Sequence, residues 1–473
     1  MYAHNIAVAG KREGLSSIMD VTEKGEFGVS TARKGDEELM NADETRLAEM
    51  GLGLGIVTEI NAGGPGAIIY GFILVTILQC FLGASLAEFV SSYPTEGGMY
   101  HWIAAVAPKK QSAFLSFLTG WFTVCGSSTN LIYAQTLGAL IALYHQDMTV
   151  KTWEIFVIYQ GLNLLTASVV LFGNKIIPGL NRFSLFYLQI GWLVVLVTVV
   201  ACAPTHQSPE FVFRTWINNT GWENNVVAFA PSRNAPLAIA ITLSIAFFTG
   251  LTYLIGLMFS VQDYSALGTT NTGLPLAELF RQATQSAGGA FGLTFILFIA
   301  LGPCVISSQL SSSRVLWAFA RDGAMPWSST WARVSSRYGI PFNAQLLVTA
   351  ANAALGCIYL GSSTAFNAML GSAVTINNIA YYIPILTNML TGRRNMYKGA
   401  FYMGKWGWLV NGVTICWLTF AIVFFSFPYA KPVTVQGMNY TCVVVGSLPI
   451  LIIGWWFWAG TFYREKIAAA KQE

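Results

Sequence analysis

The stretch at 338–392, YGIPFNAQLLVTAANAALGCIYLGSSTAFNAMLGSAVTINNIAYYIPILTNMLTG, contains no charged residue. A helix that crosses the hydrocarbon core of a bilayer needs about 20 mostly apolar residues. The stretch is long enough for two such helices, and the polar sequence GSST at 361–364 is typical of a turn between them. It therefore predicts a pair of membrane-spanning helices.

The same pattern recurs along most of the chain. Of the 473 residues, 54% are hydrophobic and only 10% are charged, whereas soluble domains carry roughly 25% charge. A transmembrane barrel would show shorter, alternating segments instead. We therefore predict an all-α integral membrane protein. Its ten expected spans lie at 67–88, 113–143, 153–172, 183–203, 237–260, 288–311, 342–361, 364–390, 407–428 and 442–462.

Lysine and arginine residues gather in alternate loops, and loops of this kind tend to be cytoplasmic. The segment at 1–49 is polar and of mixed charge, which is typical of a disordered tail. We expect this tail to be cytoplasmic, followed by a transmembrane domain at 50–463 and a cytoplasmic C-terminal tail at 464–473. The loops expected on the same side are 91–112, 173–182, 312–341 and 391–406.

This arrangement of loops requires a crossing that the apolar segments do not supply. If the loops at 173–182 and 312–341 are both cytoplasmic, the span at 183–203 ends outside and the span at 237–260 must start inside. The chain must then cross the membrane once more between these two spans. The only apolar piece between these spans is VVAFA at 226–230. At 1.5 Å per residue it covers a small part of a core roughly 30 Å thick.

A second crossing is missing at the front of the chain. The tail is expected inside and the span at 67–88 starts outside, yet only MGLGLGIV at 50–57 is apolar between them. One alternative needs neither crossing: the tail stays inside, the first four spans are inverted and the last six keep their orientation. The sequence leaves both arrangements open.

Five stretches carry more specific motifs: SLAEFVSSYPTEGGMYHWIAAVAP (85–108), NNTGW (218–222), TGLPLAELFRQAT (272–284), SSRVLWAFARDGAMP (312–326) and KPVTVQGMNYT (431–441). Together they resemble the amino acid–polyamine–organocation (APC) superfamily, and specifically its fungal choline/GABA/amino-acid permease branch. The resemblance covers nearly all of the chain after residue 40. The first and fourth stretches are the longest and most specific.

The resemblance implies an inverted-repeat helical bundle of the LeuT/APC type, with two five-helix repeats and two further helices. In that family the first helix of each repeat is broken in mid-membrane, where its unwound backbone binds substrate. The ten predicted spans align with family helices 2–5 and 7–12. The resemblance therefore implies about ten full transmembrane helices instead of twelve, with helices 1 and 6 shortened.

Polar clusters inside three apolar spans are candidate substrate-binding segments. CGSSTNLIY at 125–133, CVISSQLSSS at 304–313 and TINNIAYY at 375–382 align with family helices 3, 8 and 10. They could line a cavity for a zwitterion or amine, and an aromatic ring could hold a quaternary ammonium group. The alternative is hydrogen bonding between helices. GLGLG at 51–55 could offer backbone N–H groups to a carboxylate, or could allow close helix packing. The candidates are Gly51, Gly53, Gly55, Asn130, Tyr133, Ser307, Ser308, Asn377 and Tyr381.

Glu88 is a carboxylate near the membrane boundary, where an unpaired charge is costly. We expect either an inner-gate ion pair with Arg314 or Arg321, or an interfacial charge in contact with water. Arg314 and Arg321 are seven residues apart and share a helical face. Their plainer interpretation is positive-inside anchoring.

No enzyme motif is present, and we expect neither a cofactor nor a metal. The four histidines are scattered and there is no Walker loop. The seven cysteines include no CxxC pair and are interpreted as small buried hydrophobes. Glycosylation sequons at 218–220 and 439–441 fall in loops assigned outside.

These observations predict a secondary transporter of amino acids or related amines (GABA, choline) that works by alternating access. The resemblance suggests coupling to protons. The expected partners are a small-molecule substrate and the lipid bilayer, with no nucleic acid; the oligomeric state stays open. The expected location is the plasma membrane, with the vacuolar or another internal membrane as the alternative. The competing function is a non-transporting truncated or regulatory isoform, and we predict that the shortened chain transports poorly.

Overall fold

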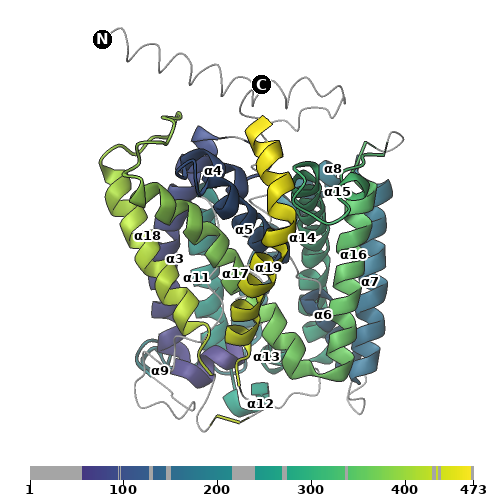
Figure 1. Ribbon diagram of the computed structural model, residues 1–473. Coiled ribbons are helices and arrows are strands. Elements are labelled where there is room, and N and C mark those ends of the chain that lie inside the picture. Colours follow the sequence, from purple (N-terminus) through teal and green to yellow (C-terminus); the bar gives the residue numbers. More distant parts are fainter. Residues whose placement is uncertain are drawn as a thin grey trace.

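The computed structural model describes residues 56–469 except 94, 96, 127–130, 145–150, 216–239, 269–273, 336–338, 429–432 and 435–437. Long helices run side by side through the bundle (Figure 1), and no strand occurs among the described residues. The predicted tail at 1–49 lies outside the described residues. The helices are α3 (Ile56–Ser92), α4 (Met99–Val106), α5 (Ser112–Cys125), α6 (Leu131–Tyr144), α7 (Thr152–Phe172), α8 (Ile177–Cys202), α9 (Pro209–Arg214), α11 (Ala240–Ser260), α12 (Tyr264–Gly268), α13 (Pro275–Thr284), α14 (Ala287–Arg321), α15 (Ser328–Trp331), α16 (Phe342–Gly361), α17 (Ser363–Leu390), α18 (Trp406–Phe424) and α19 (Thr441–Ala469).

Seven helices in the described part are long and apolar enough to cross a membrane: α3 from Gly64, α7, α8, α14, α16, α18 and α19 to Thr461. Helix also fills the described part of each other expected span: α5 and α6 cover 113–125 and 131–143, α11 covers 240–260 and α17 covers 364–390. The turn expected at 361–364 separates α16 from α17. The prediction of a helical membrane protein is thus confirmed, and the number of ten complete crossings stays a prediction.

The lysine- and arginine-rich loops lie together at one end of the bundle. Figure 1 places α4, α15, the start of α8 and the loop ahead of α18 at this end, and α9, α12 and α13 at the other. His101 in the first of these loops pairs with Asp322 in the third, with 3.0 Å between Nε2 and Oδ2. The Asn395 amide in the fourth donates to the Val106 carbonyl in the first, at 3.0 Å. The alternative arrangement, with the first four spans inverted, would separate these loops and is therefore wrong.

α8 and α11 are neighbours that run in the same direction. The Trp192 indole donates to the Thr249 carbonyl, and Gly256 packs against Leu196 and Val200 one to two turns further along both helices. The chain leaves α8 at its lower end in Figure 1 and starts α11 at the other end. A 21-residue helix is about 31 Å long. The end of α9 at Arg214 and the start of α11 at Ala240 therefore lie toward opposite ends of the bundle, and residues 216–239 between them lie outside the described residues. The piece at 226–230 that we expected to be too short lies outside the described residues.

The start of α3 lies beside the end of α9. The Gly66 N–H donates to the Thr215 carbonyl at 3.3 Å, so α3 contacts the residue that follows α9. Gly64 interrupts α3 with φ 74°, a value that glycine adopts without the steric cost of a Cβ atom. Most of the short piece at 50–57 lies outside the described residues.

Buried amide side chains join α7, α14 and α16. The Gln309 amide donates to the Asn163 side-chain oxygen at 3.0 Å, and the Gln345 amide donates to Gln309 at 3.2 Å. Asn163 also donates to the Thr349 carbonyl at 3.1 Å. These bonds satisfy polar groups that would be costly to leave unpaired in lipid, so this cluster holds three helices in register.

The sequon that begins at Asn439 is expected to carry no glycan. Only 1% of Asn439 is exposed, and its side-chain nitrogen donates to the carbonyls of Phe425 at 2.7 Å and Phe427 at 3.0 Å. N-glycosylation modifies this nitrogen and needs it at the surface. After expression in a glycosylating host, the Asn439→Gln variant should migrate in gel electrophoresis with the parent chain. A glycosidase-sensitive shift that only the parent shows would contradict this expectation.

Candidate functional site

A buried ion pair closes the end of the bundle that carries the basic loops. The Glu88 side chain at the end of α3 is fully buried, and Arg393 in the loop after α17 is 6% exposed. Arg393 Nη2 donates to Glu88 Oε1 at 2.5 Å, and the Met403 N–H donates to the same oxygen at 3.0 Å. The pair therefore ties α3 to the connection between α17 and α18.

Two features shape the space around the Arg393 guanidinium. Gly407 at the start of α18 lies directly against it, so any side chain at that position would collide with Nη1. The ring of Tyr402 lies 5.5 Å from the guanidinium carbon, within the range of a cation–π contact. The backbone of Arg393 has φ 57°, a left-handed conformation that is uncommon for residues other than glycine. The surrounding structure thus fixes the guanidinium against Glu88.

The partner that we predicted for Glu88 was wrong. Arg321 instead packs over the Trp317 ring at 5.0 Å and lies 3.3 Å from Asp322. Arg314 lies on α14, which continues ten residues past the predicted end of its span at 311. The alternative of a water-exposed Glu88 is also wrong, because the carboxylate is buried.

A second polar cluster joins α4 to the end of α14. Asp322 Oδ2 accepts a hydrogen bond from the Tyr100 hydroxyl at 2.9 Å and lies 3.0 Å from His101 Nε2. Burial raises the pKa of the Asp322 carboxyl. The hydrogen bonds from His101 and Tyr100, with the positive charges of His101 and Arg321, outweigh burial and hold the pKa below its ordinary value.

The Asp322 cluster is expected to stabilise the fold in a pH-dependent way. Because the pKa of Asp322 is lowered on folding, its contribution is complete above the unfolded pKa of about 3.9 and is lost as the pH falls through the folded value. Asp322→Asn should lower the melting temperature of the purified protein at pH 5–7, and the difference from the parent should shrink below about pH 4. A difference that grows on acidification would contradict the assignment.

Near the middle of the bundle, α5 ends where one continuous span was expected. The Asn377 amide on α17 donates to the Gly126 carbonyl at 3.1 Å, directly after α5. A side chain at Gly126 would collide with this amide. Asn377 therefore contacts the last turn of α5, inside the stretch at 113–143 that we expected as one span, and residues 127–130 of that stretch lie outside the described residues.

The other candidate residues lie on several faces. The Tyr133 ring stacks on Phe298 at 4.7 Å between α6 and α14. The Ser307 hydroxyl donates to the Asn181 side-chain oxygen at 3.0 Å, toward α8. Ser308 lies one residue further along α14, and its carbonyl accepts from the Ser312 hydroxyl at 2.8 Å. These contacts fit the expected alternative of hydrogen bonding and packing between helices.

Tyr381 is buried among apolar residues of α3, α4 and α18. Gly51, Gly53, Gly55 and Asn130 lie outside the described residues. Of the candidates that the structure describes, Asn377 is the one that donates to backbone at the end of a helix. The substrate-binding set thus stays a prediction as a whole.

Sequence reasoning missed Arg393, Tyr100, His101 and Asp322. The signal for Arg393 was present in the adjacent pair Arg393–Arg394, directly after an uncharged stretch long enough for two spans. Asp322 follows Arg321 within the motif that supported the family resemblance. Among the described residues no group of three or more His, Cys, Asp or Glu side chains is placed to hold a metal ion.

Several apolar helices of membrane-spanning length, with polar contacts buried between them, define a multi-pass membrane protein. Comparison with known proteins identifies the family. The family model described as "Amino acid permease" matches residues 46–231 and 215–448, so the chain belongs to the amino acid permease family. It is therefore a membrane transporter by family, not an enzyme, as the sequence predicted.

Two relatives and one solved structure illustrate the similarity. A "Choline transporter" of Saccharomyces cerevisiae is 34% identical, with 87% of this chain and 78% of the relative covered. "Amino-acid permease BAT1" of Arabidopsis thaliana is 28% identical, with 86% of this chain and 88% of the relative covered. The crystal structure of the Eremococcus coleocola manganese transporter, bound to an aromatic bis-isothiourea substituted compound, matches with a TM-score of 0.50. The two sequences are 14% identical, and the match covers 93% of this chain and 98% of the transporter. At this identity the match shows the fold alone.

Proposed function

We propose that the chain derives from a secondary active transporter that moves amino acids or related amines by alternating access. The observation that carries this proposal is the hydrogen bond at the end of α5, where the Asn377 amide of α17 donates to the Gly126 carbonyl between apolar helices. A substrate with charged or hydrogen-bonding groups needs such polar backbone at membrane depth. The names of the relatives, a choline transporter and an amino-acid permease, support amines and amino acids as the substrate class.

The basic end of the bundle supports alternating access. Two clusters lie there: the Glu88–Arg393 pair on the α3 side and the Asp322–His101 pair between α14 and α4. Alternating access requires contacts that close one end while the other opens. Both pairs join separate helices at the end that the charge rule assigns to the cytoplasm. They are the proposed contacts of a closed inner gate, and opening inward would require them to separate.

A second candidate function is a non-transporting form of the same protein. α8 and α11 run in the same direction, yet the sequence offers only VVAFA as apolar material for the return crossing. The match to the yeast choline transporter extends over 442 positions. It includes 87% of this 473-residue chain, about 411 residues, so about 31 positions have no counterpart here. This shortfall favours impaired transport.

Uptake by the purified chain in liposomes distinguishes the two functions. Radiolabelled choline and a panel of amino acids would be offered at the outer face, with empty liposomes as the control. Saturable uptake of any of them supports a working transporter. Uptake no greater than in empty liposomes, with the protein folded and inserted, supports the non-transporting form.

A further inference from the structure

The connection between α17 and α18 has basic and aromatic side chains on its surface. We call residues 394–406 the basic–aromatic loop. Trp406 is 72% exposed and Phe401 is 49% exposed. Large aromatic side chains gathered at the surface mark a site of contact with a partner or a membrane. The exposed basic and aromatic residues of the loop include Arg394, Lys398, Phe401, Tyr402, Lys405 and Trp406.

The backbone of this loop is fixed against the end of α3. The Phe401 N–H donates to the Ser91 hydroxyl at 2.7 Å. The Tyr397 N–H donates to the Tyr93 hydroxyl at 2.9 Å. The side chains of Phe401 and Tyr397 stay exposed while these bonds hold their backbone. A surface that is held in place in this way loses little conformational entropy when it binds a ligand.

The basic–aromatic loop lies at the boundary of the membrane. It leads directly into α18, which starts at Trp406 and is long and apolar enough to cross a bilayer. Figure 1 places the loop at the basic end of the bundle, which the charge rule assigns to the cytoplasm. Trp and Tyr side chains favour the headgroup level of a bilayer, and the cytoplasmic leaflet contains anionic lipids. The loop is therefore at the depth of anionic headgroups.

The positive charge of the loop is not balanced within this part of the chain. No Asp or Glu occurs in the sequence between Asp322 and Glu465. Among the described residues, Arg394, Lys398 and Lys405 take part in no ion pair. An anion from outside the chain can therefore pair with these three side chains.

Another basic loop at the same end provides a comparison. Lys109 and Lys110 are exposed between α4 and α5, and the sequence around them, APKKQS at 107–112, contains no aromatic residue. Orientation by the positive-inside tendency needs charge alone. In the basic–aromatic loop, aromatic rings accompany the charges, and the Tyr402 ring centre lies 5.5 Å from Lys398 Nζ. This combination fits a ligand with both an anionic and an apolar part.

We propose that the basic–aromatic loop binds an anionic phospholipid of the cytoplasmic leaflet. Arg394 and Lys398 pair with the anionic groups of the headgroup, and Lys405 adds to the attraction. Phe401 and Trp406 contact the glycerol and the upper part of the acyl chains. Free phosphate would use the basic side chains alone, whereas the lipid also uses the aromatic ones. The proposal does not depend on transport.

The test is native mass spectrometry of the full chain in detergent micelles, with equal amounts of phosphatidylserine and phosphatidylcholine. We expect adducts of phosphatidylserine to exceed those of phosphatidylcholine. Arg394→Gln/Lys398→Gln should weaken phosphatidylserine binding by roughly tenfold or more, because each basic residue near an anionic lipid surface contributes about fivefold. Excess inorganic phosphate, at an ionic strength matched with chloride, should not displace the lipid.

The matched control is Lys109→Gln/Lys110→Gln, which removes the same charge from the same end and should bind phosphatidylserine like the parent chain. Phe401→Ala/Trp406→Ala keeps the charge and should also weaken binding. All the substituted side chains are exposed, and thermal melting reports whether each variant is folded. Equal binding of the two lipids, equal loss in the two charge variants, or displacement by phosphate would overturn the proposal. Unchanged binding in Phe401→Ala/Trp406→Ala would overturn the role of the aromatic residues.

Discussion

Replacing Glu88 with Gln is expected to lower the free energy of unfolding by about 3–5 kcal/mol. The substitution keeps the size of the side chain and removes its charge. Arg393 would then be a buried cation without its counter-ion, and its Nε and Nη1 atoms already lack hydrogen-bond partners among the described residues. Denaturation of the purified protein in mixed micelles, followed by its tryptophan fluorescence, measures this loss.

The matched control is Glu210→Gln. Glu210 also pairs with an arginine, Arg214, at 3.7 Å, but both side chains are about 80% exposed. An exposed pair contributes about 0–1 kcal/mol, so this variant should behave like the parent chain. The double variant Glu88→Leu/Arg393→Leu removes both buried charges and should recover much of the stability lost in Glu88→Gln. A Glu88→Gln variant as stable as Glu210→Gln would mean that Glu88 and Arg393 do not form a buried pair.

The location of this pair shows what the sequence could predict. Charge patterning correctly placed Glu88 and several arginines at the same end of the bundle, because the positive-inside tendency acts on whole loops. It did not select the partner, since Arg393, Arg314 and Arg321 all satisfy that rule. The choice depends on side-chain geometry between residues 305 positions apart, including the space that Gly407 leaves.

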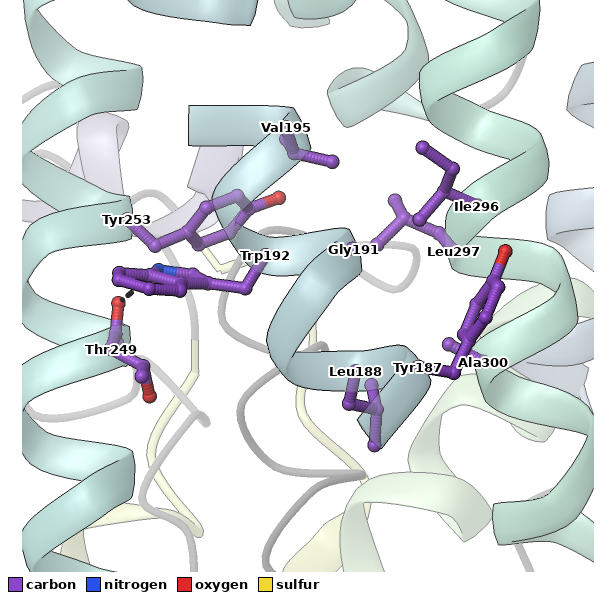
Figure 2. Close-up of a pocket in the computed structure, with 11 residues that line it drawn as sticks. Tyr187, Leu188, Gly191, Trp192, Val195, Thr249, Tyr253, Ile296, Leu297 and Ala300 are labelled. Carbon is purple, nitrogen blue, oxygen red and sulfur yellow. Dashed lines mark hydrogen bonds between the residues drawn. The ribbon is translucent and has the colours of Figure 1, made fainter. Parts of the chain in front are cut away.

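The helices show the same division between local and tertiary information. Apolar length predicted the expected spans, and GSST predicted the turn between α16 and α17. The end of α5 was missed because the apolar run continues past it, and the contact between Gly126 and Asn377 joins residues 251 positions apart. The hollow lined by Trp192, Tyr253 and Leu297 (Figure 2) was missed for the same reason, because α8, α11 and α14 form it only after they pack together.

Lengthening the two short apolar segments, 50–57 and 226–230, is expected to convert an inactive chain into an active transporter. The unmodified chain should show no saturable uptake of amino acids or choline above that of empty liposomes. In this family the substrate site is built from broken-helix backbone at mid-membrane. Because the sequence predicts that both contributing helices are shortened, we expect the polar groups near Asn377 to be open to lipid on one side. Each polar group exposed to lipid there would cost several kcal/mol.

The restored version would carry about 20–30 additional residues at each short place, taken from a close family member, ahead of 67 and between 215 and 240. Both versions must first be shown to reach the membrane in equal amounts. We expect saturable uptake by the restored chain at least tenfold above background, and its loss on Asn377→Ala. Saturable uptake by the unmodified chain, abolished by Asn377→Ala or Tyr133→Ala, would show that the short segments still complete a site. The return crossing between α8 and α11 would then be made by the residues already present, and the chain would be a complete transporter.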